Sequence, residues 1–264
     1  MNDENLWYVY AVVRSPGTVG PPAGDTLGGG LATVDHRGLT ALAERVPAAE
    51  FDEAPLRERL EDLDWLARVA RAHHGVVAEA GRHTTVVPLR LATVCRGEQG
   101  VRRLLEEGED RLLEALDRLA GAREWGVKLY VDETAGPPAA EPAGSDRPER
   151  AGSGRDYLRR RLGQQRARQD ADDAAARTAR HLHEALARTA ADTVLHPPQQ
   201  ARLSGVPGRN VLNAAYLVPE DREQRFRDAL PPPDDLHTGL RVEVTGPWVP
   251  YSFTRTGPEE GTGP

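Results

Sequence analysis

Residues 124–132 read Glu-Trp-Gly-Val-Lys-Leu-Tyr-Val-Asp, and the order of the elements that follow this segment decides the fold of the second half of the chain. Val127, Leu129 and Val131 alternate with a lysine, a tyrosine and an aspartate. Because successive side chains of a strand point to opposite faces, this period of two predicts a half-buried β-strand.

Five further elements are predicted downstream. Ser153 and Asp156 have the spacing of a capping box, which opens a long helix expected to end near Ala191. The later patterns indicate strands at residues 193–195, 211–218 and 240–244 and a helix at residues 219–230. The strand at 193–195 rests on the weakest pattern. The order strand, helix, strand, strand, helix, strand is that of a ferredoxin-like fold.

The long helix has two different faces. An apolar stripe on one side is made of Tyr157, Ala175, Ala179, Leu182 and Leu186. Leu158 and Leu162 point about 120° away from it, and polar residues interrupt the stripe between Tyr157 and Ala175. We therefore expect the middle of this helix to bury little and to be exposed to solvent.

Residues 155–168 of the same helix contain six arginines and one aspartate. This local charge has two interpretations, a solvated helix face or a site for an anionic partner. The sequence alone favours the solvated face.

The N-terminal half also mixes strands and helices. Residues 6–13, Leu-Trp-Tyr-Val-Tyr-Ala-Val-Val, are apolar on both alternating faces, which predicts a strand buried on both sides. Residues 15–30 are rich in glycine and proline and are expected to form a loop. Residues 84–94 are strand-like, and Pro88 interrupts them. Because proline donates no hydrogen bond to a sheet, this segment is an edge strand or has a bulge at Pro88.

Two helices are predicted in the N-terminal half, one before and one after the strand-like segment at residues 84–94. The first covers residues 55–77, with an apolar stripe made of Leu56, Leu60, Leu63, Ala67, Ala70, His74 and Val77 and a weaker second face made of Trp65, Val69 and Val76. The second covers residues 101–119, where the leucines keep one helical phase across Gly108. We favour one continuous helix, and the alternative is two short helices that meet at Gly108.

The fold class that follows is α+β, with two domains and a tail. We predict an N-terminal α+β domain over residues 1–120, a modified ferredoxin-like βαββαβ domain with a long helix over residues 121–246, and a C-terminal tail over residues 247–264. Residues 134–152 have no large apolar side chain and are expected to be a disordered loop. The order of elements in the N-terminal domain matches no named fold.

Charge and cysteine content exclude several classes of protein. The 264 residues include 34 basic and 41 acidic side chains, a net charge of −7. General binders of nucleic acid or anionic membranes need a positive field, so neither is an expected partner. A single cysteine, Cys95, excludes an internal disulfide and a cysteine-built metal site. The N-terminus lacks the basic region of a signal peptide, and no apolar run approaches the ~18 residues of a membrane helix, so we expect a soluble cytoplasmic protein.

Chemistry-bearing residues do not form a catalytic or metal-binding pattern. His73 and His74 are adjacent, and His181 and His183 are two residues apart, so neither pair converges on a helix. His74 falls on the predicted apolar stripe, which favours a hydrogen-bonded core histidine. Cys95 is interpreted as a buried inert thiol, because the sequence supplies no base beside it. No phosphate loop, G-x-S-x-G motif or carboxylate pair is found, so we predict no enzyme, no cofactor and no metal.

Six segments have an order and spacing that resemble a known family. They are LWYVYAVV (6–13), VVPLRLATV (86–94), EWGVKLYVD (124–132), SGRDYL (153–158), LNAAYLVP (212–219) and VTGPWVPYSF (244–253). Each is weak alone, and the most specific are Glu124–Lys128 and Gly246–Phe253. Together, from residue 6 to 253, they resemble the gas vesicle protein F/L family.

The chain departs from the family pattern at a few positions. The family more often has proline at the position of Val249, and Phe-Gly where this chain has Leu91 and Ala92. The glycine-rich residues 17–30 and the proline-rich residues 134–152 look particular to this sequence, which leaves the roles of these loops open.

The resemblance implies a non-enzymatic accessory protein of gas vesicle formation, cytoplasmic and associated with gas vesicles, with no cofactor and a C-terminal domain of modified ferredoxin fold. It implies as partner the major gas vesicle shell protein, whose assembly or nucleation it would assist, together with other gas vesicle accessory proteins. It does not distinguish an F-like from an L-like member. The competing class is a ferredoxin-like regulatory protein that binds a small molecule.

A shell subunit exposes apolar surface and unpaired strand edges before assembly, so we expect this protein to offer it a sheet edge or an apolar groove. The candidate contacts are Val86, Pro88 and Arg90 on the predicted edge strand, and Trp248, Tyr251 and Phe253 in the aromatic tail. The three aromatic residues have an alternative role, in which they dock across the two domains as a structural clamp.

Overall fold

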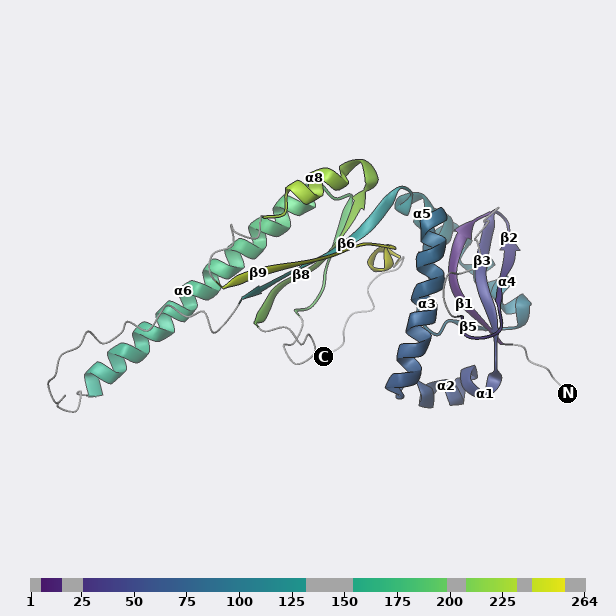
Figure 1. Cartoon of the computed structure of the whole chain (residues 1–264), viewed down its shortest axis with the longest axis horizontal. Helices are drawn as coiled ribbons and strands as arrows, with labels where there is room; N and C mark the ends of the chain where they lie inside the picture. Colours follow the sequence, from purple (N-terminus) through teal and green to yellow (C-terminus); the bar gives the residue numbers. More distant parts are fainter. Residues whose placement is uncertain (1–5, 16–25, 132–153, 199–207, 232–238, 255–264) are drawn as a thin grey trace. The chain divides into compact units, whose positions relative to one another are not determined.

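The computed structural model of the chain describes residues 6–15, 26–131, 154–198, 208–231 and 239–254 (Figure 1). Helices and strands are mixed throughout, as the sequence predicts. The predicted cap at Ser153 and the predicted loop at residues 134–152 lie outside the described residues. The chain divides into two compact units, one made of residues 1–124 and 247–264 and the other of residues 125–246. Residues 247–264, predicted as a separate tail, are therefore grouped with the first unit.

The first unit is built around strand β1 (Leu6–Arg14). Every residue from Leu6 to Val13 is buried, which confirms the prediction of a strand covered on both faces. Its antiparallel partners are β3 (Leu39–Val46) along one edge and β4 (Val86–Pro88) and β5 (Val94–Arg96) along the other. β1 is thus the interior strand to which the rest of the sheet is added.

Strands β2 (Leu31–His36) and β3 form a hairpin that was not predicted from the residue pattern. The turn between them consists of Arg37 and Gly38, both with positive φ (41° and 84°), which is the backbone of a two-residue hairpin turn. Residues 39–46 are rich in alanine, leucine, glutamate and arginine, which favour helices. The strand is therefore set by its pairing with β1 and β2 rather than by local propensity.

The strand-like segment at residues 84–94 is two short strands, β4 and β5, with a turn between them. β4 is the last strand in the order β2-β3-β1-β4, so the interpretation of Pro88 as an edge-strand residue is confirmed. In the turn, the amide of Leu89 donates to the carbonyl oxygen of Tyr10 at 2.9 Å. Ala92 has a φ of 62°, a conformation that costs a non-glycine residue free energy.

The helix predicted at residues 55–77 is broken into two. After a short helix α1 (Ala48–Phe51), the chain forms α2 (Glu53–Arg59) and α3 (Leu63–His83). The side chain of Asp62 caps α3, accepting from the amides of Asp64 at 3.1 Å and Trp65 at 3.2 Å. A single helix across this point is therefore a wrong prediction, because Asp62 starts a new one.

The break also changes which face of α3 is buried. Of the predicted stripe, Val77 is buried, but Leu60 is 43% exposed and Leu63 is 77% exposed, and the predicted weaker face is the one in the core. The buried residues of this face include Trp65, Val69, His73, Val76 and Ala80. The predicted stripe depended on one phase from Leu56 to Val77, which the chain does not keep. The core histidine is accordingly His73, while His74 is exposed.

The helix favoured at residues 101–119 is likewise two helices, α4 (Gly97–Glu107) and α5 (Glu109–Leu119), so the alternative of a break at Gly108 is correct. Gly108 has φ −103° and ψ 2°, outside helical values. The helical phase survives because the Gly108 amide donates to the Leu104 carbonyl at 3.2 Å and the Leu112 amide donates to the Gly108 carbonyl at 2.8 Å. A Cβ at Gly108 would lie 3.1 Å from the Leu104 carbonyl oxygen and 3.1 Å from Cδ1 of Leu112, so this position has little room for a side chain.

The second unit contains the elements predicted from residue 124 onward, in the predicted order. They are β6 (Ala122–Val131), α6 (Gly154–Ala187), β7 (Asp192–Leu195), β8 (Arg209–Pro219), α8 (Glu223–Asp228, after a 3₁₀ turn at Glu220–Arg222) and β9 (Leu240–Trp248). The sheet has the order β7-β8-β6-β9. The weakly indicated strand at 193–195 is therefore real, and it forms one edge of the sheet.

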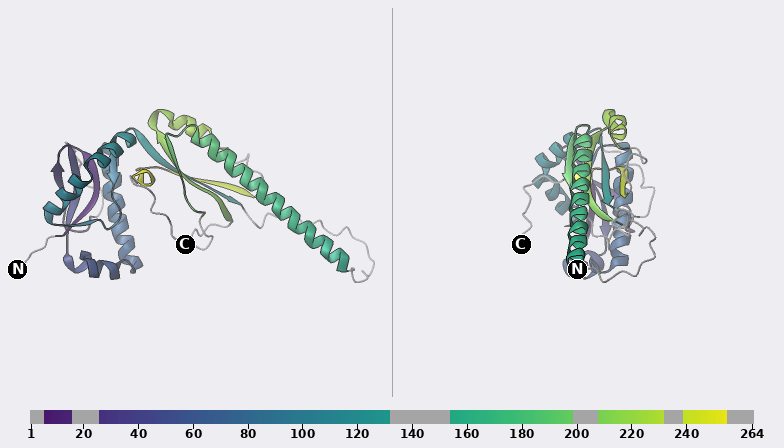
Figure 2. Two further views of the ribbon diagram at one scale, coloured as in Figure 1. Left: turned by 180° about the vertical axis from the view of Figure 1, so that it is seen from behind. Right: turned by 90° about the vertical axis from the view of Figure 1, so that its left-hand side faces the viewer.

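The C-terminal half of α6 packs on this sheet, while its N-terminal half extends past it (Figures 1 and 2). Ala179, Leu182 and Leu186 join Val127 and Leu129 in the core of the unit. The stripe predicted on α6 is therefore confirmed over its last three turns. Every residue from Arg161 to Ala174 is exposed, which confirms the prediction for the middle of the helix.

Candidate functional site

The described C-terminal segment, residues 247–254, which we call the tail, lies against the first unit and ends in a 3₁₀ turn at Tyr251–Phe253. The guanidinium of Arg118 on α5 donates to the carbonyl oxygen of Phe253 at 2.6 Å. The amide and hydroxyl of Ser252 donate to the two carboxylate oxygens of Glu124 at 2.8 and 2.7 Å. Charged groups on both sides thus hold the tail by its polar atoms.

A glycine in α3 makes room for the apolar part of the tail. Val249 is 6% exposed and belongs to the core of the first unit. A Cβ at Gly81 would lie 2.6 Å from Cγ2 of Val249 and 3.5 Å from Cγ1 of Val86. The carbonyl of Gly81 accepts a hydrogen bond from the Arg123 guanidinium at 2.7 Å. Val249 and Val86 therefore meet at the same backbone position.

A buried polar pair lies beside the tail. The hydroxyl of Tyr8 lies 2.9 Å from Nδ1 of His73, and the Ala92 amide donates to the same hydroxyl at 3.1 Å. The ring of Tyr251 lies 6.2 Å from the His73 ring, between centroids. Burial, and secondarily the neighbouring His74, lower the pKa of His73 to about 4, while burial raises the pKa of Tyr8 to about 12. His73 is therefore neutral at physiological pH.

A second buried polar group anchors residues 27–29 to the sheet. Glu44 on β3 is fully buried and accepts hydrogen bonds from the Tyr10 hydroxyl at 2.5 Å and the Leu27 amide at 3.0 Å, and also from the Gly29 amide. Burial, together with Glu44, raises the pKa of Tyr10 far above its usual value. Three donors thus compensate one buried carboxylate, which is a structural arrangement.

Of the six residues predicted as partner contacts, three are in the interior. Val86, Pro88 and Phe253 are buried, so their side chains do not reach the surface. Tyr251 is half-buried, whereas Arg90 and Trp248 are exposed. Trp248 is 46% exposed, and its ring packs edge-on against the exposed His74 ring at 5.8 Å. The structure brings Val86 and the tail together around α3 as packing partners.

Sequence patterns did not single out the space at Gly81 or its occupant Val249. An isolated glycine inside a helix is the one local signal that could have indicated a packing role at Gly81. Gly81 and Val249 are 168 positions apart in the sequence, and a periodic pattern of side chains does not indicate a contact between such distant residues.

The remaining chemistry-bearing residues do not form a site in the described residues. Cys95 is half-buried on β5, and burial raises the pKa of its thiol, so it is not activated. His183 Nδ1 lies 3.0 Å from the hydroxyl of Tyr216. Within the described ranges there is no cluster of three or more metal-ligating side chains. No helix in the described part of the chain is long and apolar enough to cross a membrane.

Comparison with known proteins decides the family. The family model described as "Gas vesicle synthesis protein GvpL/GvpF" matches residues 6–255. The chain belongs to the GvpL/GvpF family. It is 49% identical to gas vesicle protein L of Streptomyces sp. (strain CB03234) over 98% of this chain and 97% of that protein. It is 29% identical to gas vesicle protein F of the same strain, over 93% and 98% of the two chains.

A solved GvpF structure has the same fold. The crystal structure of gas vesicle protein GvpF from Anabaena sp. PCC7120 aligns with a TM-score of 0.63 at 21% identity, covering 96% of this chain and 97% of that one. At this identity the likeness concerns the fold, and it extends over both units of this GvpL/GvpF chain.

The motifs that carry the GvpL/GvpF resemblance have packing roles in this structure. Glu124 holds Ser252 of the tail, and Trp125 is buried in the core of the second unit with the Arg227 guanidinium 5.0 Å from its ring centroid. A Cβ at Gly126 would lie 2.6 Å from Oγ1 of Thr245 on β9. Residues of the Glu-Trp-Gly motif on β6 therefore contact two C-terminal segments, the tail at Ser252 and β9 at Thr245.

Proposed function

We propose that this protein is a non-enzymatic accessory factor that binds the hydrophobic shell protein of gas vesicles and assists its assembly or nucleation, at the gas vesicle and with other accessory proteins as further partners. The observation that carries this proposal is the match to the gas vesicle synthesis family over residues 6–255, joined by 49% identity to a gas vesicle protein L. The lower identity to the F protein of the same strain supports an L-type member.

The physical need for such a factor follows from the wall that it would help to build. A wall that retains gas presents an apolar face, so its subunits are prone to aggregate before assembly. An accessory protein that covers apolar surface or pairs with a free strand edge suppresses that aggregation. Neither task requires a reactive group.

The outer edge of β9 is the best candidate for strand pairing. β9 is nine residues long and is the terminal strand of its sheet, pairing with β6 in the described residues. Val244 on this strand is 37% exposed. The predicted edge at β4 is only three residues long and all three are buried, so it has less backbone available for pairing with a partner strand. We therefore place the proposed sheet-edge contact at β9.

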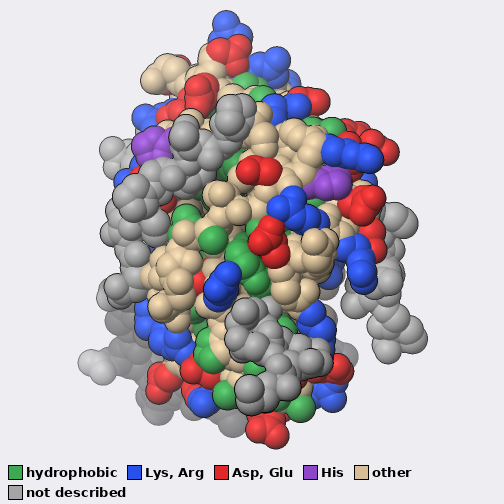
Figure 3. Space-filling view, turned by 90° about the vertical axis from the view of Figure 1, so that its right-hand side faces the viewer, with side chains coloured by type: hydrophobic (Ala, Val, Ile, Leu, Met, Phe, Trp, Pro, Cys, Tyr) green, Lys and Arg blue, Asp and Glu red, His purple; other side chains and the backbone are tan. Residues whose placement is uncertain are grey.

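We also infer that the two compact units are separate domains and that the second is a modified ferredoxin-like domain. The element order β6-α6-β7-β8-α8-β9 and the sheet order β7-β8-β6-β9 support this assignment. On the face of the first unit seen in Figure 3, acidic and basic side chains are interspersed, which suits a protein partner better than nucleic acid.

Co-expression with the shell protein tests the proposal. We expect the shell protein to stay in the supernatant and to co-purify with this chain. Val244→Lys should weaken co-purification, because a lysine on an edge strand opposes pairing. Leu195→Lys is the matched control, since Leu195 is also exposed (62%) but lies on β7 at the opposite edge. Absence of a complex with the unmodified chain would refute shell binding, and a stronger effect at Leu195 would move the contact to β7.

A further inference from the structure

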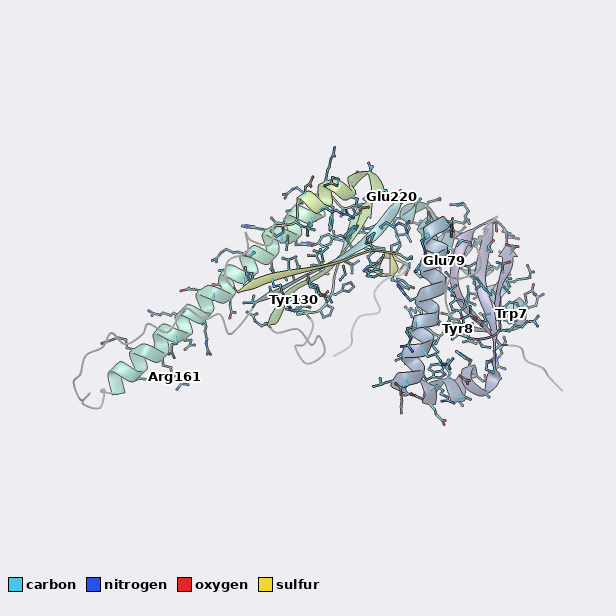
Figure 4. The ribbon with its side chains drawn as sticks, viewed as in Figure 1. Trp7, Tyr8, Glu79, Tyr130, Arg161 and Glu220 are labelled. Atoms are coloured by element: carbon cyan, nitrogen blue, oxygen red, sulfur yellow. The ribbon has the colours of Figure 1, made fainter. Side chains whose placement is uncertain are left out.

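The N-terminal half of α6 is a long helical surface with a defined chemical pattern. Leu158 and Leu162 are 58% and 56% exposed, one turn apart. No residue between Arg161 and Ala174 is buried, whereas Ala175, Ala179 and Leu182 on the next turns are. Figure 4 shows Arg161 on the part of α6 that lies beyond the sheet.

Arginines border the two leucines on both sides. At about 100° per residue, Arg159 and Arg166 lie about 60–80° to one side of the leucine pair, and Arg161 and Arg168 lie about 80–100° to the other. From residue 157 to 169 the sequence contains five arginines and no carboxylate. Arg161, Arg166 and Arg168 form no ion pair within the described part of the chain. The surface therefore combines an apolar centre with two positive borders.

This half of the helix has little to stabilise it in the isolated chain. It buries no side chain between residues 161 and 174, and isolated helices of about this length are marginal in water. Gly163 costs a further ~1 kcal/mol relative to alanine in a helix interior. Of the nearby carboxylates, Asp172 is engaged by Arg209. A bound partner would supply the missing stabilisation.

We propose that residues 158–168 of α6 are a docking surface for an acidic amphipathic helix of a partner protein. The leucine pair would pack against an apolar seam, and the arginine rows would meet carboxylates on either side of that seam, as in a charged helix–helix interface. The span from Leu158 to Arg168 is about 15 Å, or roughly three turns of a partner helix. This site is separate from the strand edge of β9 and does not depend on the shell protein.

Charge selects this partner over two others. A second copy that docked through this part of α6 would offer only Asp170 and Asp173 to the four arginines, because Asp172 is already paired with Arg209. A membrane surface requires a broad apolar face, whereas only two large apolar residues are exposed on this stretch. An acidic helix satisfies both the arginines and the leucines.

The test uses the full-length protein and a labelled synthetic peptide of three heptads, with leucine at positions a and d and glutamate at e and g. We expect saturable binding in fluorescence anisotropy that weakens at least tenfold between about 50 and 300 mM salt. Leu158→Ser/Leu162→Ser and Arg161→Glu/Arg168→Glu should each weaken binding at least tenfold. A peptide with lysine at e and g should bind a protein in which all four border arginines (Arg159, Arg161, Arg166 and Arg168) are changed to glutamate, and not the unmodified chain.

Controls on the opposite face of α6 separate recognition from loss of helix. Ala167→Ser/Ala171→Ser and Gln164→Glu should leave affinity unchanged, because these exposed positions lie about 140–160° or more from the leucine pair. Equal binding of a scrambled peptide, or no saturable binding up to about 100 μM, overturns the proposal. So does a dimer in light scattering that Leu158→Ser/Leu162→Ser dissociates, or binding to anionic phosphatidylserine vesicles without binding to the peptide.

Discussion

A Cβ atom at Gly81 of α3 would lie 2.6 Å from Cγ2 of Val249, so the tail reaches the core only because this helix position has no side chain. Gly81→Ala must displace a stiff, buried valine, and we expect it to lower the free energy of unfolding by about 1–3 kcal/mol. The measurement is urea denaturation followed by tryptophan fluorescence, to which Trp7 and Trp65, both buried in the first unit, contribute.

Gly75 on the same helix provides the matched control, because nothing lies within 4 Å of a Cβ built there. Gly75→Ala should be neutral or stabilising by up to about 1 kcal/mol, since alanine is the better helix former. Val249→Ala should restore part of the stability lost in Gly81→Ala. Equal effects of the two glycine substitutions would contradict the close contact.

The sequence predicted the parts of the fold that depend on local patterns. Complete burial of residues 6–13, the alternation of β6 as far as Leu129 and the stripe of α6 from Ala179 to Leu186 agree with the structure. The element order of the second unit could be predicted for the same reason. Beyond Leu129 the alternation fails, because Tyr130, predicted on the exposed face, is buried and Val131 is only half-buried.

The predictions of the fold that were wrong fail at single residues where a helix ends or a new one begins. Asp62 caps a new helix and rotates the buried face from His74 to His73, and Gly108 breaks a helix without changing its phase. Strand β3 has the composition of a helix, so only its pairing with β1 makes it a strand.

The candidate site was less predictable because it depends on contacts between distant segments. Burial of Val86, Pro88 and Phe253 follows from packing that no local period encodes. Trp248 and Phe253 are both aromatic residues of the same short C-terminal segment, yet Trp248 is exposed and Phe253 is in the core. The exposure of the α6 arginines, in contrast, was readable from the interrupted stripe.

Removal of the tail tests its role as a structural clamp. A chain that ends at Gly246 loses Val249 and Phe253 from the interior and leaves Arg118 without its carbonyl acceptor. We expect the melting temperature to fall, by about 2–4 °C for each kcal/mol lost. A chain that ends at Thr254 keeps all these contacts and should melt as the full chain does. Unchanged stability of the Gly246 truncation, together with lost partner binding, would show instead that the tail is a contact surface.

Ala92 is predicted to be a site of stabilisation. Its φ of 62° costs an alanine about 1–2 kcal/mol, and the larger chain entropy of glycine in the unfolded state offsets part of the gain. Ala92→Gly should therefore raise the free energy of unfolding by about 0.5–1 kcal/mol. Ala92→Val should lower it, because a β-branched residue suits positive φ least. Denaturant midpoints of the three proteins provide the comparison, and a less stable glycine variant would contradict the prediction.

The buried His73 makes stability depend on pH in a definite direction. Burial lowers its pKa to about 4 in the folded state, whereas an unfolded chain has the ordinary value near 6.5, so below about pH 6.5 the unfolded state binds the proton more readily. The stability provided by neutral His73 is complete above about pH 6.5 and is lost as the pH falls toward 4, up to about 3 kcal/mol in total. Urea midpoints measured between pH 7 and pH 5, above the range in which most carboxylates titrate, should therefore fall in the unmodified chain. His73→Gln removes the titrating group and should flatten this slope, while His74→Gln, at an exposed position that contributes only secondarily to the lowered pKa of His73, should keep most of it. A slope that survives in His73→Gln would assign the pH dependence to another group and place His73 in a solvated environment.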